Sequence, residues 1–340
     1  MPLLTVIAAL LALLVLVVVW NRMAVARWAG QPQPPGKRVN VGGAAWYVTV
    51  KGTGAPAVVI ETALTGLSPE WWALQEVLAQ HTTVVTYDRA GYGWSAAPTT
   101  PRTSANIAQE ARALLAALNL PAPFVLVGHS QGGLYAQHFA RLYPQDTAGV
   151  VLLDPLSPDD NRFKAELPPE LYQGSGADKS MNLKIGAVMS RLGLLGLLKP
   201  LLLKSPPFFY FRDMPRERIE LIWRHMLRPE LYSTALDENT QAHLPENSAA
   251  LHAAGAFPAV PLKILYHDGE VNISEMMQYG GLTREQAQQL ETFWENLLRE
   301  LLSLSPQSEW VPCPTSGHFI QHSRPDLVRA AVLAVVAQKQ

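Results

Sequence analysis

The chain has 340 residues, of which 48% are hydrophobic and 16% are charged, so we expect a sizeable folded core rather than a disordered chain. Its formal net charge is -1 and it has no long basic run, which argues against a nucleic-acid partner. The single cysteine, Cys313, excludes an internal disulfide and a cysteine-rich metal site. We expect no metal and no cofactor, because the sequence has neither a metal-ligand cluster nor a phosphate or dinucleotide motif.

The first segment of the chain is an apolar run over residues 3–20, just long enough to cross a bilayer as a helix. We predict a retained membrane anchor over 1–22 and a proline-containing linker over 23–38. The alternative is a signal peptide cleaved at the Ala-Val-Ala sequence at 24–26, which the absence of Lys or Arg before the run disfavours. Because basic residues follow the run, the positive-inside rule predicts a cytoplasmic main domain.

In the rest of the chain, short apolar strands alternate with helical patterns. A loosely alternating pattern over 39–50 predicts an antiparallel hairpin. Buried strands are expected at 57–60, 83–87, 124–127, 148–153, 262–266 and 309–313. Helices are expected at 70–80, 104–118 (capped by Ser104), 134–143, 284–302 and 326–338. The alternation is interrupted over 156–258, which we interpret as a helical insertion into an α/β sheet.

A G-x-S-x-G sequence at 128–132 is centred on Ser130, with an expected strand before it and an expected helix after it. This strand–turn–helix context is the one in which the motif presents a nucleophilic serine. The tight turn requires small neighbours, and Gly128, Gly132 and Gly133 meet that requirement. The flanks therefore favour a nucleophile over an ordinary strand–helix turn.

A serine hydroxyl is a weak nucleophile at neutral pH, so it needs a histidine base and an acid that orients this base. His318 follows the last expected strand and precedes the last expected helix, where a sheet of this type presents a residue beside the serine. His322 is the alternative base. His129 is expected to point away from the serine, and the other histidines have no motif around them.

Two aspartates compete for the role of the acid, and both preserve the chain order serine, acid, histidine. Asp154 ends the strand at 148–153, alone among apolar residues, where a charge without a role would be awkward. Asp268 follows the strand at 262–266, with Glu270 close behind it. We prefer Asp154, although Asp154 could instead cap the start of the insertion and Asp268 could simply form a turn.

The oxyanion formed in acyl transfer needs two backbone N–H donors. One is expected from Gln131, directly after the serine, and the other from the loop after the strand at 57–60. Ala63 is our choice in that loop, with Leu64 as the alternative.

Together these motifs resemble those of the α/β-hydrolase superfamily, over residues 39–340. The resemblance rests on the sequence at 128–133, the D-R-x-G-x-G-x-S loop at 88–95 and the S-G-H-F-I sequence at 316–320. It implies the α/β-hydrolase fold, a mostly parallel eight-stranded sheet with helices on both faces, with 156–258 as a helical cap over the site.

The chain departs from the family pattern at two places: Glu61-Thr62 replaces the usual His-Gly, and the usual G-x-x-D after the strand at 262–266 is not clean. The second departure also favours Asp154 as the acid. The resemblance disfavours epoxide hydrolases and dehalogenases, which carry an aspartate where Ser130 stands.

The expected function is a membrane-anchored serine esterase or lipase that acts on a small hydrophobic ester. The apolar stretches at 192–203 and 206–211 could line an acyl-chain pocket or could equally form ordinary core between cap and sheet. Two alternatives share the scaffold: an acyltransferase or perhydrolase that uses the same acyl-enzyme, and a non-catalytic ligand-binding protein.

Overall fold

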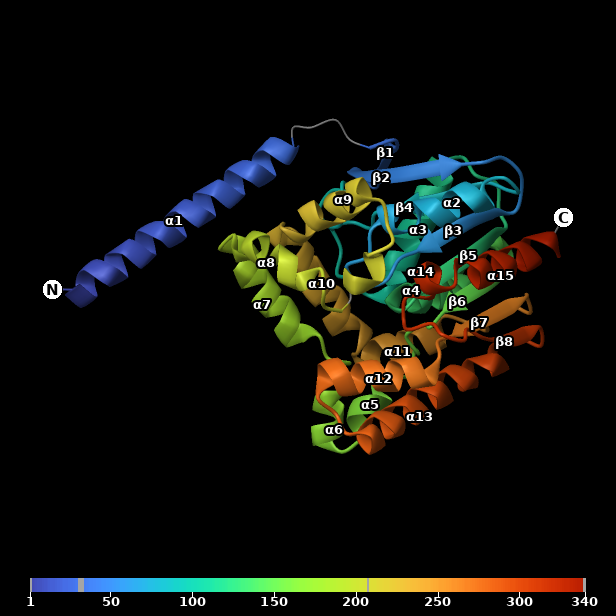
Figure 1. Ribbon diagram of the computed structural model, residues 1–340. Helices are drawn as coiled ribbons and strands as arrows, with labels where there is room; N and C mark the ends of the chain where they lie inside the picture. The colour runs from blue at the N-terminus through green and yellow to red at the C-terminus, as the bar shows by residue number, and fades with distance from the viewer. Residues whose placement is uncertain (1, 30–33, 207, 339–340) are drawn as a thin grey trace.

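The computed structural model describes residues 2–29, 34–206 and 208–338, and its centre is an eight-stranded sheet (Figure 1). The strand order is β1-β2-β4-β3-β5-β6-β7-β8. The strands are β1 (Lys37–Val41), β2 (Ala44–Lys51), β3 (Ala57–Glu61), β4 (Val84–Tyr87), β5 (Phe124–His129), β6 (Thr147–Leu153), β7 (Leu262–Tyr266) and β8 (Ser308–Pro312). Strand β2 pairs antiparallel with β1 and with β4, and all the other pairs are parallel. The expected mostly parallel α/β sheet is confirmed.

The central strands are buried on both faces because apolar residues occupy successive positions along them. In β5, Leu126 packs into one hydrophobic cluster, while Val125 and Val127 pack into the other. Helices α3 (Ser104–Ala117), α4 (Gln131–Leu142) and α13 (Arg284–Glu300) cover the first face, and α2 (Trp72–Leu78) and α15 (Pro325–Ala337) cover the second. The parallel strands therefore present their carboxyl ends at one edge of a rigid core.

The expected helical insertion lies between β6 and β7. Its helices are α5 (Arg162–Glu166), α6 (Pro169–Gly174), α7 (Ser180–Arg191), α8 (Leu194–Leu202), α9 (Arg216–Met226), α10 (Pro229–Ala242) and α11 (Pro245–Ala253), with a short turn of helix at Phe208–Phe211. Of the predicted apolar stretch at 206–211, residue 207 lies outside the described residues. We call the region between β6 and β7 the cap.

Two local expectations need correction. Ser104 is the first residue of α3 and not its cap, because the Thr103 side chain accepts the hydrogen bond from the Asn106 N–H. A helix that we did not expect, α12 (Gly269–Gly280), begins directly after β7. The Asp268 side chain caps it by accepting a hydrogen bond from the Glu270 N–H.

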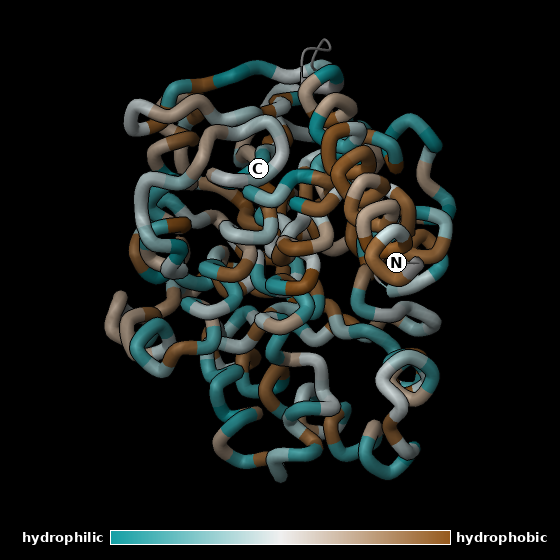
Figure 2. The backbone as a smooth tube through the Cα atoms, turned by 90° about the vertical axis from the view of Figure 1, so that its left-hand side faces the viewer, coloured by the Kyte–Doolittle hydropathy of each residue, from teal (hydrophilic) through white to brown (hydrophobic). Residues whose placement is uncertain are grey.

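The N-terminal helix, α1 (Pro2–Ala29), continues well past the predicted boundary at residue 22, and residues 30–33 of the predicted linker lie outside the described residues. Within the described chain, only Leu3–Arg27 is long and apolar enough to cross a membrane, with a mean hydropathy of 3.1. Figure 2 shows the apolar character along this helix. None of that helix's most apolar window is buried against the protein, a pattern that fits either an anchor or a signal sequence.

Candidate active site

Ser130 stands at the sharp turn between β5 and α4, with a backbone φ of 53° and ψ of -123°. A non-glycine residue in this region is strained, and such strain is held only where the surroundings fix it. The Ser130 N–H donates to the Leu153 carbonyl at 3.0 Å, which ties the turn to the end of β6. The strained turn therefore holds Ser130 at the carboxyl end of β5, beside the end of β6.

The glycines around Ser130 are required by close backbone approaches. A Cβ added to Gly128 would lie 2.6 Å from the Gly132 carbonyl oxygen. A Cβ on Gly132 would lie 2.3 Å from the Glu61 carbonyl oxygen, and one on Gly133 would lie 2.4 Å from the Pro155 side chain. Any larger residue at these positions must displace backbone, so the turn is packed tightly against both neighbouring loops.

Asp154 lies immediately after β6, fully buried, with a positive φ of 40°. Its N–H donates to the Leu265 carbonyl at 2.8 Å, which fixes the residue beside the end of β7. The carboxylate Oδ2 accepts a hydrogen bond from His318 Nδ1 at 2.5 Å. The structure thus brings the preferred acid and the preferred base together.

His318 lies on the loop between β8 and α14 (Ile320–Ser323), and its side chain is partly exposed. The neighbouring His129 is buried and donates from Nε2 to the His318 carbonyl at 2.9 Å. The rings of His129 and His318 lie 4.9 Å apart between centroids. The residue before Ser130 therefore holds the base loop in place, and burial lowers the pKa of His129 well below its usual range.

A second histidine, His267, also donates to the Asp154 carboxylate, from Nδ1 to Oδ2 at 2.7 Å. Its other nitrogen, Nε2, lies 2.9 Å from the Glu291 carboxylate on α13. Trp294, one helical turn further on, donates from its indole nitrogen to Asp154 Oδ1 at 3.0 Å. Sequence reasoning missed all three residues. The only signal was that His267 directly follows a buried strand, as Asp154 does.

Both ring nitrogens of His267 face carboxylates, so both carry protons and the side chain is an imidazolium. Burial alone would lower the pKa of His267, but Asp154 and Glu291 raise it to about 10. Burial alone would likewise raise the pKa of Asp154, but the charge of His267 and the hydrogen bonds from His267 and His318 hold that pKa below its usual range. Asp154 therefore stays ionised at neutral pH.

The other candidates for acid and base lie elsewhere. Asp268 caps α12 and accepts a hydrogen bond from the Thr315 N–H at 2.9 Å. Glu270 is exposed and pairs with Arg284 at 2.7 Å. The His322 ring packs against the ring of Phe319, with 6.1 Å between centroids. Among the described residues, no hydrogen bond joins Asp268 or Glu270 to His318. None joins His322 to Asp154.

The expected oxyanion donors flank the serine turn. Gln131 is the first residue of α4, and Ala63 lies in the loop after β3 that Gly132 contacts. Within the described chain, no hydrogen bond runs from the Gln131 or Ala63 N–H to another residue. Both N–H groups are thus without a hydrogen-bond partner among the described residues.

The loop after β3 is held by Arg89, a residue of the 88–95 loop. The Arg89 guanidinium donates to the Thr62 carbonyl at 2.7 Å and to the Ala63 carbonyl at 2.9 Å. The same side chain pairs with Glu238 of α10 at 2.9 Å, and both residues are buried. Arg89 therefore connects the loop carrying the expected oxyanion donor to the cap.

Comparisons with known proteins agree with this fold. A model of the alpha/beta hydrolase family matches residues 63–331. A protein of Gibberella zeae described as an AB hydrolase superfamily protein is 24% identical over 298 residues, 83% of this chain and 86% of its own. The solved structure of the epoxide hydrolase CorEH superposes with a TM-score of 0.65 at 17% identity, over 90% of this chain and 99% of its own. A thermophilic esterase from Thermogutta terrifontis superposes with a TM-score of 0.59 at 22% identity, over the same shares.

Proposed function

The chain belongs to the alpha/beta hydrolase family, and from this premise we propose that it is a serine hydrolase that cleaves a carboxylic ester. In this proposal Ser130 is the nucleophile, His318 is the general base and Asp154 orients His318. The backbone N–H groups of Gln131 and Ala63 form the oxyanion hole.

One observation carries the proposal: His318 Nδ1 donates to a buried, ionised Asp154 at 2.5 Å, next to a strained Ser130. The Asp154 bond keeps the proton on Nδ1, so that Nε2 is the basic nitrogen. Epoxide hydrolases appear among the structural neighbours, but this similarity is below 25% identity and supports the fold alone. The serine at the turn favours ester chemistry.

The reaction follows from these positions. Nε2 of His318 removes the proton of the Ser130 hydroxyl as the serine Oγ attacks the ester carbonyl carbon. The tetrahedral oxyanion accepts hydrogen bonds from the Gln131 and Ala63 N–H groups. His318 then returns the proton to the departing alcohol, leaving an acyl-enzyme. Water, deprotonated by His318, attacks this ester, and the acid leaves as Ser130 regains its proton.

We also propose that α1 is retained and anchors the protein in a membrane, with the catalytic domain on the cytoplasmic side. Asn21 is buried and donates to the Ser190 carbonyl of α7 at 3.4 Å. A Cβ on Gly193 would lie 2.6 Å from the Asn21 side chain, so α1 packs closely against the start of α8. A segment that packs against the cap supports retention, and an anchor favours a hydrophobic ester as substrate.

The test is labelling of the full-length protein with a fluorophosphonate probe, which reacts with activated serines. Wild type should label, Ser130→Ala should not, and Ser233→Ala, which removes an exposed serine of the cap, should label like wild type. A folded wild type that fails to label would contradict the proposal and favour a ligand-binding role. Analysis of products from a p-nitrophenyl ester, with and without a competing alcohol, would separate hydrolysis from acyl transfer.

A further inference from the structure

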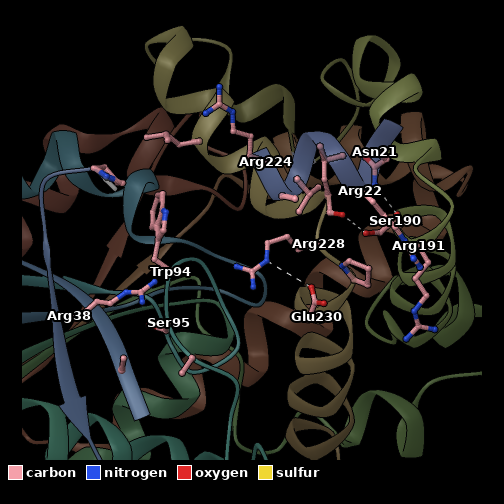
Figure 3. Close-up of a pocket in the computed structure, with 18 residues that line it drawn as sticks. Asn21, Arg22, Arg38, Trp94, Ser95, Ser190, Arg191, Arg224, Arg228 and Glu230 are labelled. Carbon is pink, nitrogen blue, oxygen red and sulfur yellow. Dashed lines mark hydrogen bonds and ion pairs between the residues drawn. The ribbon is translucent and has the colours of Figure 1, made fainter. Parts of the chain in front are cut away.

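A large cavity, whose lining does not include the serine turn, lies between the end of α1, strand β1 and helices α7 and α9 (Figure 3). Its volume is about 740 Å³. Five arginines line it, from four different parts of the fold: Arg22, Arg38, Arg191, Arg224 and Arg228. Among the described residues that line it, Glu230 is the only carboxylate. The cavity is therefore strongly cationic in a chain whose overall net charge is -1.

Most of this positive charge is not neutralised by the protein. Arg228 donates to the Gly93 carbonyl at 2.8 Å and lies 3.9 Å from Glu230. Three other lining arginines form no ion pair within the described chain: Arg22, Arg38 and Arg191. Guanidinium groups that line one cavity can recognise phosphate oxygens, since each presents a planar fork of donors.

An apolar surface adjoins the cavity. Helix α7, which ends at the cavity with Arg191, exposes three apolar side chains one helical turn apart: Met181, Ile185 and Val188. Helix α8 exposes Leu197 and Leu201, each with 63% of its surface accessible. Scattered exposed leucines are ordinary, but these helices pack beside each other and beside the end of α1.

Together, the cavity and the apolar side chains match the order of groups in a lipid monolayer. Arg22 follows the apolar part of α1 directly, at the depth where headgroup phosphates lie if α1 spans a bilayer. The apolar side chains of α7 and α8 would then rest among acyl chains, and the arginines would face phosphate. The charge selects an anionic surface over a neutral one.

We propose that the arginine cavity binds the phosphate of an anionic phospholipid and docks the cap onto the membrane. This site is separate from Ser130 and goes beyond the ester hydrolysis proposed above. A free phosphate ion has the same charged group, but it would not use the adjoining apolar side chains. The lipid headgroup is therefore the occupant that accounts for both features.

The experiment uses the full-length protein in a neutral detergent, titrated with dihexanoyl phosphatidylglycerol and followed by isothermal titration calorimetry. Dihexanoyl phosphatidylcholine and inorganic phosphate are titrated in parallel. The cavity variant combines Arg22→Gln, Arg38→Gln and Arg191→Gln. A matched control removes the same charge from exposed arginines outside the cavity lining, with Arg212→Gln, Arg216→Gln and Arg284→Gln.

Phosphatidylglycerol should bind wild type and the control variant alike and bind the cavity variant roughly a hundredfold more weakly. This estimate assigns about fivefold in the binding constant to each arginine near an anionic surface. Equal binding to the cavity variant would overturn the proposal. If inorganic phosphate binds as tightly as phosphatidylglycerol, the cavity is a soluble-anion site. If phosphatidylcholine binds as tightly as phosphatidylglycerol, the binding is apolar adsorption. Each of these two results would also overturn the proposal. Fluorophosphonate labelling of Ser130 in the same preparations reports the proposed hydrolase function independently.

Discussion

His267 and Asp154 form a buried ion pair, in which the imidazole Nδ1 lies 2.7 Å from the carboxylate Oδ2. The same carboxylate oxygen accepts the hydrogen bond from His318. One aspartate thus bonds both the proposed base, His318, and a second histidine that is charged at neutral pH. Because the two charges attract each other, the pKa of His267 is raised and that of Asp154 is lowered.

The first prediction concerns the identity of the acid. Asp154→Asn should lower kcat by about 10³–10⁴-fold, because the amide disturbs the His318 tautomer and cannot stabilise its imidazolium. Asp268→Asn should change kcat by only a few fold, since asparagine also caps helices. Steady-state hydrolysis of a p-nitrophenyl ester checks both, with thermal unfolding as the control for folding. A large loss in the Asp268 variant alone would reverse the assignment.

The second prediction concerns the pH–rate profile. His267→Gln leaves the negative charge of Asp154 uncompensated and therefore favours protonated, inactive His318. The acidic limb of kcat/KM should move to higher pH by about one unit or more. A shift of one pH unit needs a change of only about 1.36 kcal/mol in the electrostatic interaction. A unit charge at about 4 Å contributes more than that even at an effective dielectric constant of about 20.

Other charged groups around this ion pair remain in the variant. Glu291 faces His267 from α13, and the Tyr266 hydroxyl donates to Glu291. Glu275 of α12 interacts electrostatically with His267 and His318. His138→Gln is the matched control, because it also changes a buried histidine. The His138 Nδ1 atom lies 2.7 Å from the Ser104 hydroxyl and does not bond Asp154. A uniform loss of activity with an unmoved acidic limb would mean that His267 has only a structural role.

A third prediction links the same histidine to stability. The folded protein raises the pKa of His267 from 6.5 to about 10, so the ion pair stabilises the fold fully below pH 6.5 and is lost as pH rises through 10. The difference in thermal midpoint between wild type and His267→Gln should therefore be largest at pH 6 and shrink towards pH 10. Scans at several pH values in neutral detergent measure it. A difference that stays constant with pH would contradict the assigned charge.

The fourth prediction concerns Arg89 and Glu238. Arg89→Met should lower the free energy of unfolding by about 3–5 kcal/mol, because it leaves the Glu238 carboxylate buried without its main partner. The double variant Arg89→Met/Glu238→Leu should lose less than the sum of the two single changes. Urea denaturation of the four proteins measures the coupling. Arg162→Met, at an exposed pair with Glu300, should cost within about 1 kcal/mol, and strict additivity at the buried pair would contradict the prediction.

Most of the sheet could be predicted from the sequence because its signals are local. Continuous apolar runs marked the buried strands, and the polar residues that follow β5 and β6, Ser130 and Asp154, stood out against them. His318 could be selected because it follows the last strand. Each of these choices needed only a few neighbouring residues, together with the rule that parallel strands end at a common edge.

The partners behind Asp154 could not be found in this way. Glu291 and Trp294 lie on a surface-type amphipathic helix, and nothing in its pattern shows which side chains reach the site. His267 lacked a motif because its role depends on carboxylates more than 20 residues away in either direction. The continuation of α1 to Ala29 was also missed, because the apolar run that predicted this helix ends at Trp20.

The buried Arg89–Glu238 pair also limits how a substrate can reach the serine. Lifting α10 away from the loop at 61–66 would leave the buried Glu238 carboxylate without its partners Arg89 and Arg102, at a cost comparable to much of the stability of an ordinary domain. Opening is therefore expected in other parts of the cap, among them α8, which packs against α1. If α1 is the membrane anchor proposed above, a substrate dissolved in the bilayer would arrive from the lipid side, and the rate of hydrolysis would follow its concentration in the membrane rather than in water.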